Sequence, residues 1–225
     1  MSDSNGAWGR LAEHDTTMAG VWDGYARLPD PGENAALDAL CERKRITINA
    51  LVRLGAKLAE PTVLAFAYEG GIKFRDMVTG RRWSYVDSSW DKLLFIRAEQ
   101  PSTTCIVAEG ETDGARLAML YPDVDVAVMG GGAKYVPESF IEQTADYELV
   151  LVALDADEAG EAGAAKWAEH AANAMRFAPP ANDWCATPDE EVPRLPSELE
   201  RQPEPIMLVS AGDLFELDKI GRAHV

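Results

Sequence analysis

The strongest constraint on the fold is an apolar run that ends in a carboxylate. Residues 149–154 read Leu-Val-Leu-Val-Ala-Leu, and Asp155 follows immediately. A continuous run of this kind, without polar alternation, is typical of a strand buried on both faces of a parallel sheet. A second apolar run, residues 106–108, stops at Glu109 and Gly110. The two runs predict two strands of one parallel sheet.

Residues 105–178 extend this pattern into an alternation of strands and helices. Strands are predicted at 106–108, 124–129, 149–154 and 174–178, and helices at 113–121, 136–145 and 159–174. Such alternation is the signature of a parallel sheet wrapped by helices with right-handed crossovers. The expected fold class is α/β, with a smaller α+β basic subdomain in front of the sheet.

The segment before residue 100 has a different character. Apolar residues recur at helical spacing from 33 to about 59, on both sides of the basic triplet 43–45, and Gly55 and Pro61 mark helix exits. We expect this triplet to be a solvated helix end, with a nucleic-acid contact as the alternative.

Residues 62–86 predict an antiparallel sheet with a basic face. Lys73, Arg75 and Arg82, together with Trp83 and Tyr85, are expected on one exposed face, where they would follow a phosphate backbone and stack bases. An amphipathic sheet with a merely solvated basic face explains the segment equally well.

Four parts are expected along the chain. They are an N-terminal arm (1–35), a basic α+β subdomain (36–100), a catalytic domain (101–190), and an acidic, proline-rich linker with a C-terminal tail (191–225).

Composition and charge narrow the classes of protein that the chain can represent. Hydrophobic residues make up 47% of the 225 and charged residues 26%, which is typical of a soluble globular protein. The formal net charge of −17 argues against nonspecific nucleic-acid binding over the whole surface, since phosphate affinity comes from Lys and Arg. Residues 43–97 hold a large share of those cations, so a local basic groove stays open.

Two further features exclude particular classes. Cys41, Cys105 and Cys185 are far apart and form no C-x-x-C pair, so we exclude a zinc ribbon and expect small buried or half-buried residues. No apolar run approaches the roughly 20 residues of a membrane helix, and the first residues lack a signal-peptide pattern. We expect a cytoplasmic protein without a membrane partner.

The carboxylates that follow the strands predict a metal site. Glu109, Asp155 and Asp157 come directly after two strands of one parallel sheet, and ligands collect outside the carboxyl ends of such strands. Like charges raise each other's pKa, so several carboxylates gathered at one edge favour a cation. Hard oxygen ligands suit Mg²⁺ or Mn²⁺. The alternative is that Asp155 or Asp157 caps the helix that begins near residue 159.

Three glycines at 130–132 stand between a predicted strand and a helix. They would let backbone N–H groups approach a phosphate. Glycine triplets are also ordinary turns, and the G-x-G-x-x-G spacing of dinucleotide sites is missing.

These motifs carry a family resemblance. E-G-E-T-D-G at 109–114, G-G-G-A-K at 130–134 and D-A-D-E-A-G at 155–160 resemble the Toprim domain shared by primases and topoisomerases. More narrowly, they are similar to the primase half of bacteriophage primase-helicases. Basic and aromatic residues upstream resemble the subdomain that precedes Toprim there, so the likeness covers roughly residues 43–190.

The resemblance implies roles for individual residues. Glu109 would be the general acid/base or a metal-linked carboxylate, and Asp155 and Asp157 would be metal ligands. Asp113 matches the aspartate that ends the first motif, and Asp183 would add a further acidic ligand. Further contributors are implied as a group: Lys73, Arg75, Arg82 and Lys134 for nucleotide or DNA, with Gly110 and Gly131 in support. Lys134 would compensate for Asn182, which stands where primases often carry lysine.

The implied activity is that of a DNA primase. Such a DNA-directed RNA polymerase, a nucleotidyltransferase of DNA replication, uses Mg²⁺ or Mn²⁺ to make short RNA primers on single-stranded DNA from nucleoside triphosphates. The chain shows neither a zinc module nor the G-x-x-x-x-G-K-[ST] loop, so we expect a primase core that acts with a separate replicative helicase.

Two other functions stay open at the level of sequence. A Toprim nuclease uses the same carboxylates with water as the nucleophile. A catalytically silent Toprim protein would keep the fold and bind a replication or defence partner through its acidic surface. A topoisomerase is disfavoured, because the remaining length is too short for a DNA-gate domain.

Overall fold

The structure, a computed structural model, describes residues 18–86 and 88–196. Residues 1–17 of the predicted arm and residues 197–225 of the predicted tail lie outside the described part. The elements described below belong to one compact unit that ends at Pro193. No helix in the described ranges is both long and apolar enough to cross a membrane.

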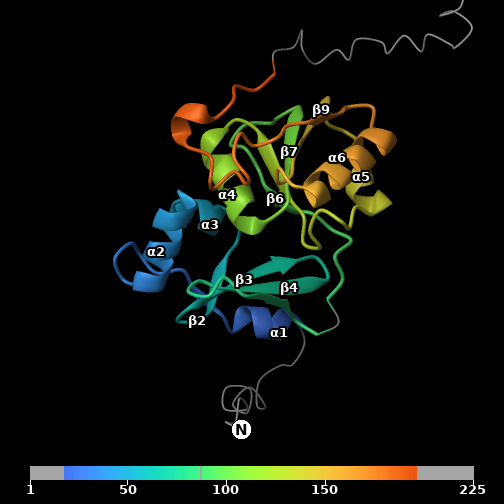
Figure 1. Cartoon of the computed structure of the whole chain (residues 1–225). Coiled ribbons are helices and arrows are strands. Elements are labelled where there is room, and N and C mark those ends of the chain that lie inside the picture. Colours follow the sequence, from blue (N-terminus) through green and yellow to red (C-terminus); the bar gives the residue numbers. More distant parts are fainter. Residues whose placement is uncertain (1–17, 87, 197–225) are drawn as a thin grey trace, which may run out of the picture. The chain divides into compact units, whose positions relative to one another are not determined.

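An antiparallel sheet of five strands comes first in the chain (Figure 1). Its strands are arranged in sequence order: β1 (Ala26–Arg27), β2 (Lys57–Glu60), β3 (Val63–Tyr68), β4 (Gly71–Asp76) and β5 (Arg82–Ser84). Three helices accompany them: α1 (Met18–Asp23), α2 (Ala35–Lys44) and α3 (Ile48–Arg53).

The second sheet contains the parallel strands that the sequence predicts. Its order is β10-β9-β7-β8-β6, in which β7–β10 are mutually parallel and only the edge strand β6 is antiparallel. The strands are β6 (Leu94–Ile96), β7 (Thr104–Ala108), β8 (Asp125–Val128), β9 (Leu149–Ala153) and β10 (Ala174–Arg176). Every residue of β7, β8 and β9 is buried, as their continuous apolar runs require.

Helices cover both faces of this second sheet. They are α4 (Glu111–Leu120), α5 (Glu138–Thr144) and α6 (Glu158–His170), followed by a short 3₁₀ turn, Asp189–Glu191. Phe140 of α5 and Trp167 of α6 pack into one core with alternate residues of β7 and β9. α4 packs on the other face, where the Cα of Gly114 lies so close to Val128 that a Cβ would be 2.3 Å from Val128 Cγ2. The predicted α/β class, a parallel sheet flanked by helices, is confirmed.

The helical prediction for residues 33–59 is wrong in two places. Arg45 takes a left-handed conformation, with φ of 52°, and so ends α2, while the Thr47 side chain caps α3. After Gly55, which has φ of 75°, residues 57–60 form β2 and pair with β3. Gly55 ends the helical part as predicted, but the spacing of apolar residues shows neither the break at Arg45 nor the strand that follows Gly55. In the second sheet and its helices, element ends lie within four residues of the prediction, and three strand ends coincide with it.

The prediction of one exposed face with cations and aromatics together is also wrong. Phe74 and Trp83 are register partners and stack with ring centroids 5.5 Å apart, on the face of the first sheet that packs against α1. Lys73 and Arg75 alternate with Phe74 along β4, so their side chains take the opposite face. The cations and the aromatics therefore lie on opposite faces of the sheet.

Candidate metal and nucleotide site

The predicted carboxylates lie at the point where the strand order of the second sheet reverses. β7 is followed by β8 on one side, and the chain then crosses to β9 on the other side. Ligands in open α/β sheets bind outside the carboxyl ends of the strands at this switch point. Ala108 and Ala153 are register partners at the ends of β7 and β9, and Glu109 and Asp155 follow them by one and two residues.

Glu109 and Asp155 each present an oxygen that is buried without a partner. Among the described residues, Glu109 Oε2 and Asp155 Oδ1 accept no hydrogen bond. A buried carboxylate oxygen that lacks a donor is costly, and it is the form that a bound cation would satisfy. These two atoms fit the predicted metal.

The electrostatics of Asp155 show how closely the acids gather. Burial raises the pKa of its carboxyl to about 7, and repulsion from Asp113, Glu109, Asp183 and Asp157 adds to the shift. The other four predicted carboxylates therefore all lie within electrostatic reach of Asp155. At neutral pH a divalent cation would compete with a proton for Asp155.

Asp157 has the structural role that the sequence raised as the alternative. Its Oδ1 accepts a hydrogen bond from Gly160 N–H at 2.8 Å, so it caps α6. Asp155 caps no helix and keeps its buried oxygen open. Asp157 is exposed beside it, so of the two predicted ligands on this strand, Asp155 is the better placed.

A second group of ligand atoms adjoins the first. Carboxylate oxygens of Asp113 and Asp183 and the thiol of Cys185 all lie within 4.8 Å of one another. Cys185 N–H donates to Asp113 Oδ1 at 3.2 Å. Burial, followed by the charge of Asp183, raises the pKa of Asp113, while Lys44 opposes the shift. The sequence indicated both aspartates but not Cys185, whose only signal is its place two residues after Asp183.

The basic triplet ends α2, and Arg43 and Arg45 are exposed as predicted, but each member also contacts another part of the fold. Arg43 donates to the Met77 carbonyl at 2.8 Å and Arg45 to that of Thr187 at 3.1 Å. Lys44 forms an ion pair with Asp183 at 3.4 Å. The predicted helix end is therefore confirmed, whereas a helical pattern does not reveal its contacts to distant residues.

Lys73 and Arg75 face α4 instead of solvent. Lys73 Nζ lies 2.9 Å from Glu111 Oε1 and donates to the Gly130 carbonyl at 3.1 Å. Arg75 is only 8% exposed, and its contact to Thr112 Oγ1 is 3.4 Å long, while its Nε has no partner. These cations join the first sheet to the helix that follows Glu109.

Glu111 is a residue that sequence reasoning missed. Its side chain is 1% exposed and accepts from Tyr68 OH at 2.7 Å as well as from Lys73. It lies inside the E-G-E-T-D-G motif. However, a glutamate in the first turn of a helix is common, because its negative charge interacts favourably with the helix dipole.

The remaining predicted residues lie at the surface or in the turns around the acids. Arg82 and Lys134 are exposed. Gly110 occupies the N-cap of α4, where a Cβ would be 3.4 Å from Asp113 Oδ2. A Cβ on Gly131 would be 2.9 Å from Tyr135 Cδ1.

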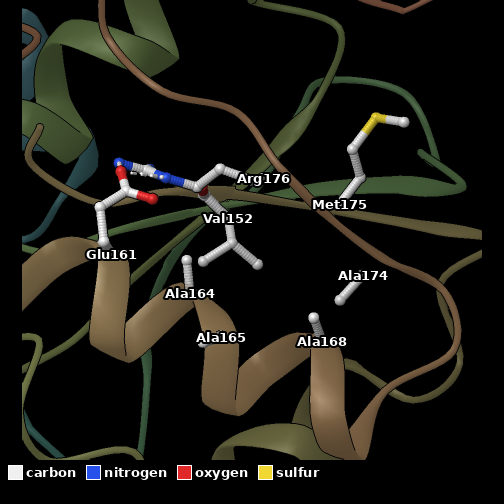
Figure 2. Close-up of a pocket in the computed structure, with 8 residues that line it drawn as sticks. All are labelled: Val152, Glu161, Ala164, Ala165, Ala168, Ala174, Met175 and Arg176. Carbon is white, nitrogen blue, oxygen red and sulfur yellow. Dashed lines mark hydrogen bonds and ion pairs between the residues drawn. The ribbon is translucent and has the colours of Figure 1, made fainter.

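Arg176 fixes the backbone at Asp155. Its guanidinium donates to the carbonyls of Leu154 at 2.8 Å and Asp155 at 3.0 Å, and it pairs with Glu161 of α6 at 2.6 Å. Figure 2 shows Arg176 and Glu161 meeting at one end of a hollow between α6 and β10, whose remaining wall is mostly alanine. None of the predicted metal ligands lines this hollow.

Several solved structures with a similar fold come from primases or from assemblies that contain them. The primase fragment of the bacteriophage T7 primase-helicase protein matches with a TM-score of 0.55 at 18% identity, over 72% of this chain and 73% of that chain. The chain has a phage-primase-like Toprim fold. The catalytic domain of the DnaG primase, solved with single-stranded DNA, matches this primase fold with a TM-score of 0.53 at 13% identity, over 73% of this chain and 72% of that one.

A third match is a chain in a larger assembly. In it, the T7 lagging-strand DNA polymerase interacts with primase domains bound to an RNA/DNA hybrid and dTTP; the TM-score is 0.52 at 18% identity, over 71% of this chain and 82% of that one. No model of a known protein family matches the sequence, and neither does any curated protein sequence. The primase fold is thus shared at low sequence identity.

Proposed function

We propose that the chain is a DNA primase, a metal-dependent nucleotidyltransferase that makes short RNA on single-stranded DNA. The observation that carries the proposal is the pair of buried, unpartnered oxygens, Glu109 Oε2 and Asp155 Oδ1, at the switch point of a primase-like fold. Such a pair suits a cation better than a structural ion pair, because no Lys or Arg within residues 18–86 and 88–196 satisfies either oxygen.

We assign the metal-holding role to Glu109 and Asp155, with Asp113 and Asp183 beside them and Asp157 at the rim. Mg²⁺ or Mn²⁺ held there would supply charge neutralisation on phosphate and a lowered pKa for an attacking hydroxyl. Arg176 keeps the Asp155 carbonyl fixed, so the carboxylate is oriented before any ligand arrives.

The cations divide into two groups in this proposal. The exposed Arg82 and Lys134 are free to bind the phosphates of a template or of a nucleoside triphosphate. Lys73 and Arg75, which face Glu111 and Thr112, contribute mainly by holding α4 in place.

Primer synthesis on single-stranded DNA with labelled nucleoside triphosphates and Mn²⁺ or Mg²⁺ tests the proposal. We expect short RNA from the wild type and a loss of at least about 100-fold for Glu109→Gln or Asp155→Asn. Asp123→Asn, an exposed aspartate ahead of β8, serves as the matched control and should retain activity.

The same reaction separates the rival functions. DNA that becomes shorter, with no RNA made and with dependence on Asp155, would identify a nuclease instead. Absence of both products, together with no calorimetric binding of Mn²⁺, would identify a catalytically silent protein and refute the proposal.

A further inference from the structure

Tyr135 stands out on the surface next to the proposed site. It is 44% exposed, and it is the only aromatic among the exposed large hydrophobic residues in the part of the chain that the structure describes. A single exposed ring is common at protein surfaces, so the case for Tyr135 rests on how the ring is held and on what lies beside it.

The Tyr135 ring is held firmly in spite of its exposure. Its hydroxyl donates to Asp91 Oδ1 at 2.7 Å, and its edge packs against Phe140 with centroids 6.4 Å apart. Its Cδ1 would lie 2.9 Å from a Cβ on Gly131, so the ring rests directly on that glycine. A ring fixed at three points loses little conformational entropy when a ligand stacks on it.

The glycines explain why this ring and the carboxylates are close. Gly131 lies under Tyr135, and the next residue, Gly132, would place a Cβ 3.8 Å from Glu109 Oε1. Tyr135 N–H also donates to the Gly132 carbonyl at 3.1 Å. One turn of chain therefore connects the ring to the carboxylate that we assign to the metal.

Positive charge adjoins the same turn. Lys134 precedes the tyrosine and is exposed, and the exposed Lys166 of α6 donates to the Lys134 carbonyl at 3.0 Å. In a chain with a net charge of −17, an exposed lysine next to the ring in sequence and a second lysine bound to that residue's carbonyl form a local feature suited to a phosphate and a base together.

We propose that Tyr135 is a stacking platform for a nucleobase whose phosphates lie at the carboxylate edge, and this rests on the proposed function. The base comes from a nucleoside triphosphate or from the single-stranded template, and both present the same π face. Stacking on an aromatic ring is tolerant of sequence, because every base offers such a face.

Binding measurements with and without a base test this inference. ATP and inorganic triphosphate, each with Mg²⁺, would be titrated calorimetrically, and an oligothymidylate would be followed by fluorescence anisotropy. We expect Tyr135→Ala to weaken ATP or the oligonucleotide by about 5- to 150-fold, from the free energy of one base–aromatic stack. Inorganic triphosphate, which lacks a base, should bind unchanged.

Three further variants sharpen the test. Tyr135→Phe keeps the ring but loses the hydrogen bond to Asp91, so it should bind base-bearing ligands better than Tyr135→Ala and no better than the wild type. Gly131→Ala pushes the ring aside and should weaken base-bearing ligands. Val78→Ala removes an exposed side chain on the turn after β4 and serves as the control. Thermal unfolding of each variant would show that the fold is intact.

The results show whether the stacked base belongs to the nucleoside triphosphate or to the template, and whether Tyr135 stacks on a base at all. Loss of ATP affinity alone identifies the nucleotide's base, and loss of oligonucleotide affinity alone identifies the template's. Unchanged binding of both, or an equal loss for inorganic triphosphate, overturns the stacking role while leaving the proposed function standing. A wild type that binds neither ATP nor DNA refutes the proposed function and the stacking role together.

Discussion

Replacing Glu111 by glutamine tests how much the buried ion pair between Lys73 of β4 and Glu111 of α4 stabilises the fold. The side chain is 1% exposed, and its Oε1 contacts Lys73 Nζ at 2.9 Å and Tyr68 OH at 2.7 Å. Glutamine keeps the size and can still accept from the tyrosine, but it removes the negative charge. Lys73, only 12% exposed, would keep its hydrogen bond to the Gly130 carbonyl and lose its counter-charge.

The structure sets the size of the expected effect. Removing one partner of a buried ion pair costs about 3–5 kcal/mol. Because glutamine retains one hydrogen bond and Lys73 is not fully buried, we expect the lower end, about 3 kcal/mol. For a unit of this length that corresponds to a fall in melting temperature of about 6–12 °C.

Denaturant and thermal unfolding followed by circular dichroism provide the assay. Lys73→Met and the double variant complete a double-mutant cycle, in which we expect a coupling energy of about 1–3 kcal/mol. Glu169→Gln, a change at a glutamate whose side chain is 72% exposed, is the matched control and should shift stability by no more than about 0.5 kcal/mol.

Two results would refute this reasoning. A Glu111→Gln variant that is as stable as the Glu169→Gln control would mean that the charge is solvated and the pair contributes nothing. Strict additivity in the cycle would mean that Lys73 and Glu111 act separately, so that the lysine stays available for a ligand.

Two further predictions concern Asp155. Its folded-state pKa of about 7 lies above the unfolded value, so the metal-free protein should lose stability as pH rises from about 4 to 7. Asp155→Asn should flatten that pH profile and abolish any rise in melting temperature that Mn²⁺ causes at pH 8; a profile like that of the wild type would contradict the assignment. Gly160→Ala would bring a Cβ to 2.0 Å from the Asp155 carbonyl oxygen, so we expect it to lower the melting temperature and Mn²⁺ affinity together, whereas Ala165→Ser, on an exposed position of the same helix, should change neither.

Much of the fold could be predicted from the sequence, because strands buried on both faces appear as continuous apolar runs. The strands around Ile106 and Leu151 lie in the middle of a doubly covered sheet, so nearly every residue in them is apolar. The acids that follow them could be placed at one edge because parallel strands end together.

The ends of helices and strands, and the breaks between them, were harder to predict. The left-handed Arg45 interrupts a helical spacing of apolar residues that continues across it. Gly55 could be predicted as a helix exit, but the strand after it could not. The sequence also could not show which face of β4 each side chain occupies relative to α4, because that depends on how the two sheets pack.

The sequence by itself determined the α/β class and the carboxylates from which a metal site can be built. Only the tertiary structure decided their individual surroundings: Asp157 caps a helix, Asp155 keeps a buried oxygen open, and Lys73 is paired with Glu111. The physical reason is that periodicity and spacing report burial along one element. Hydrogen-bond partners and the charges that shift a pKa come from residues far away in the chain.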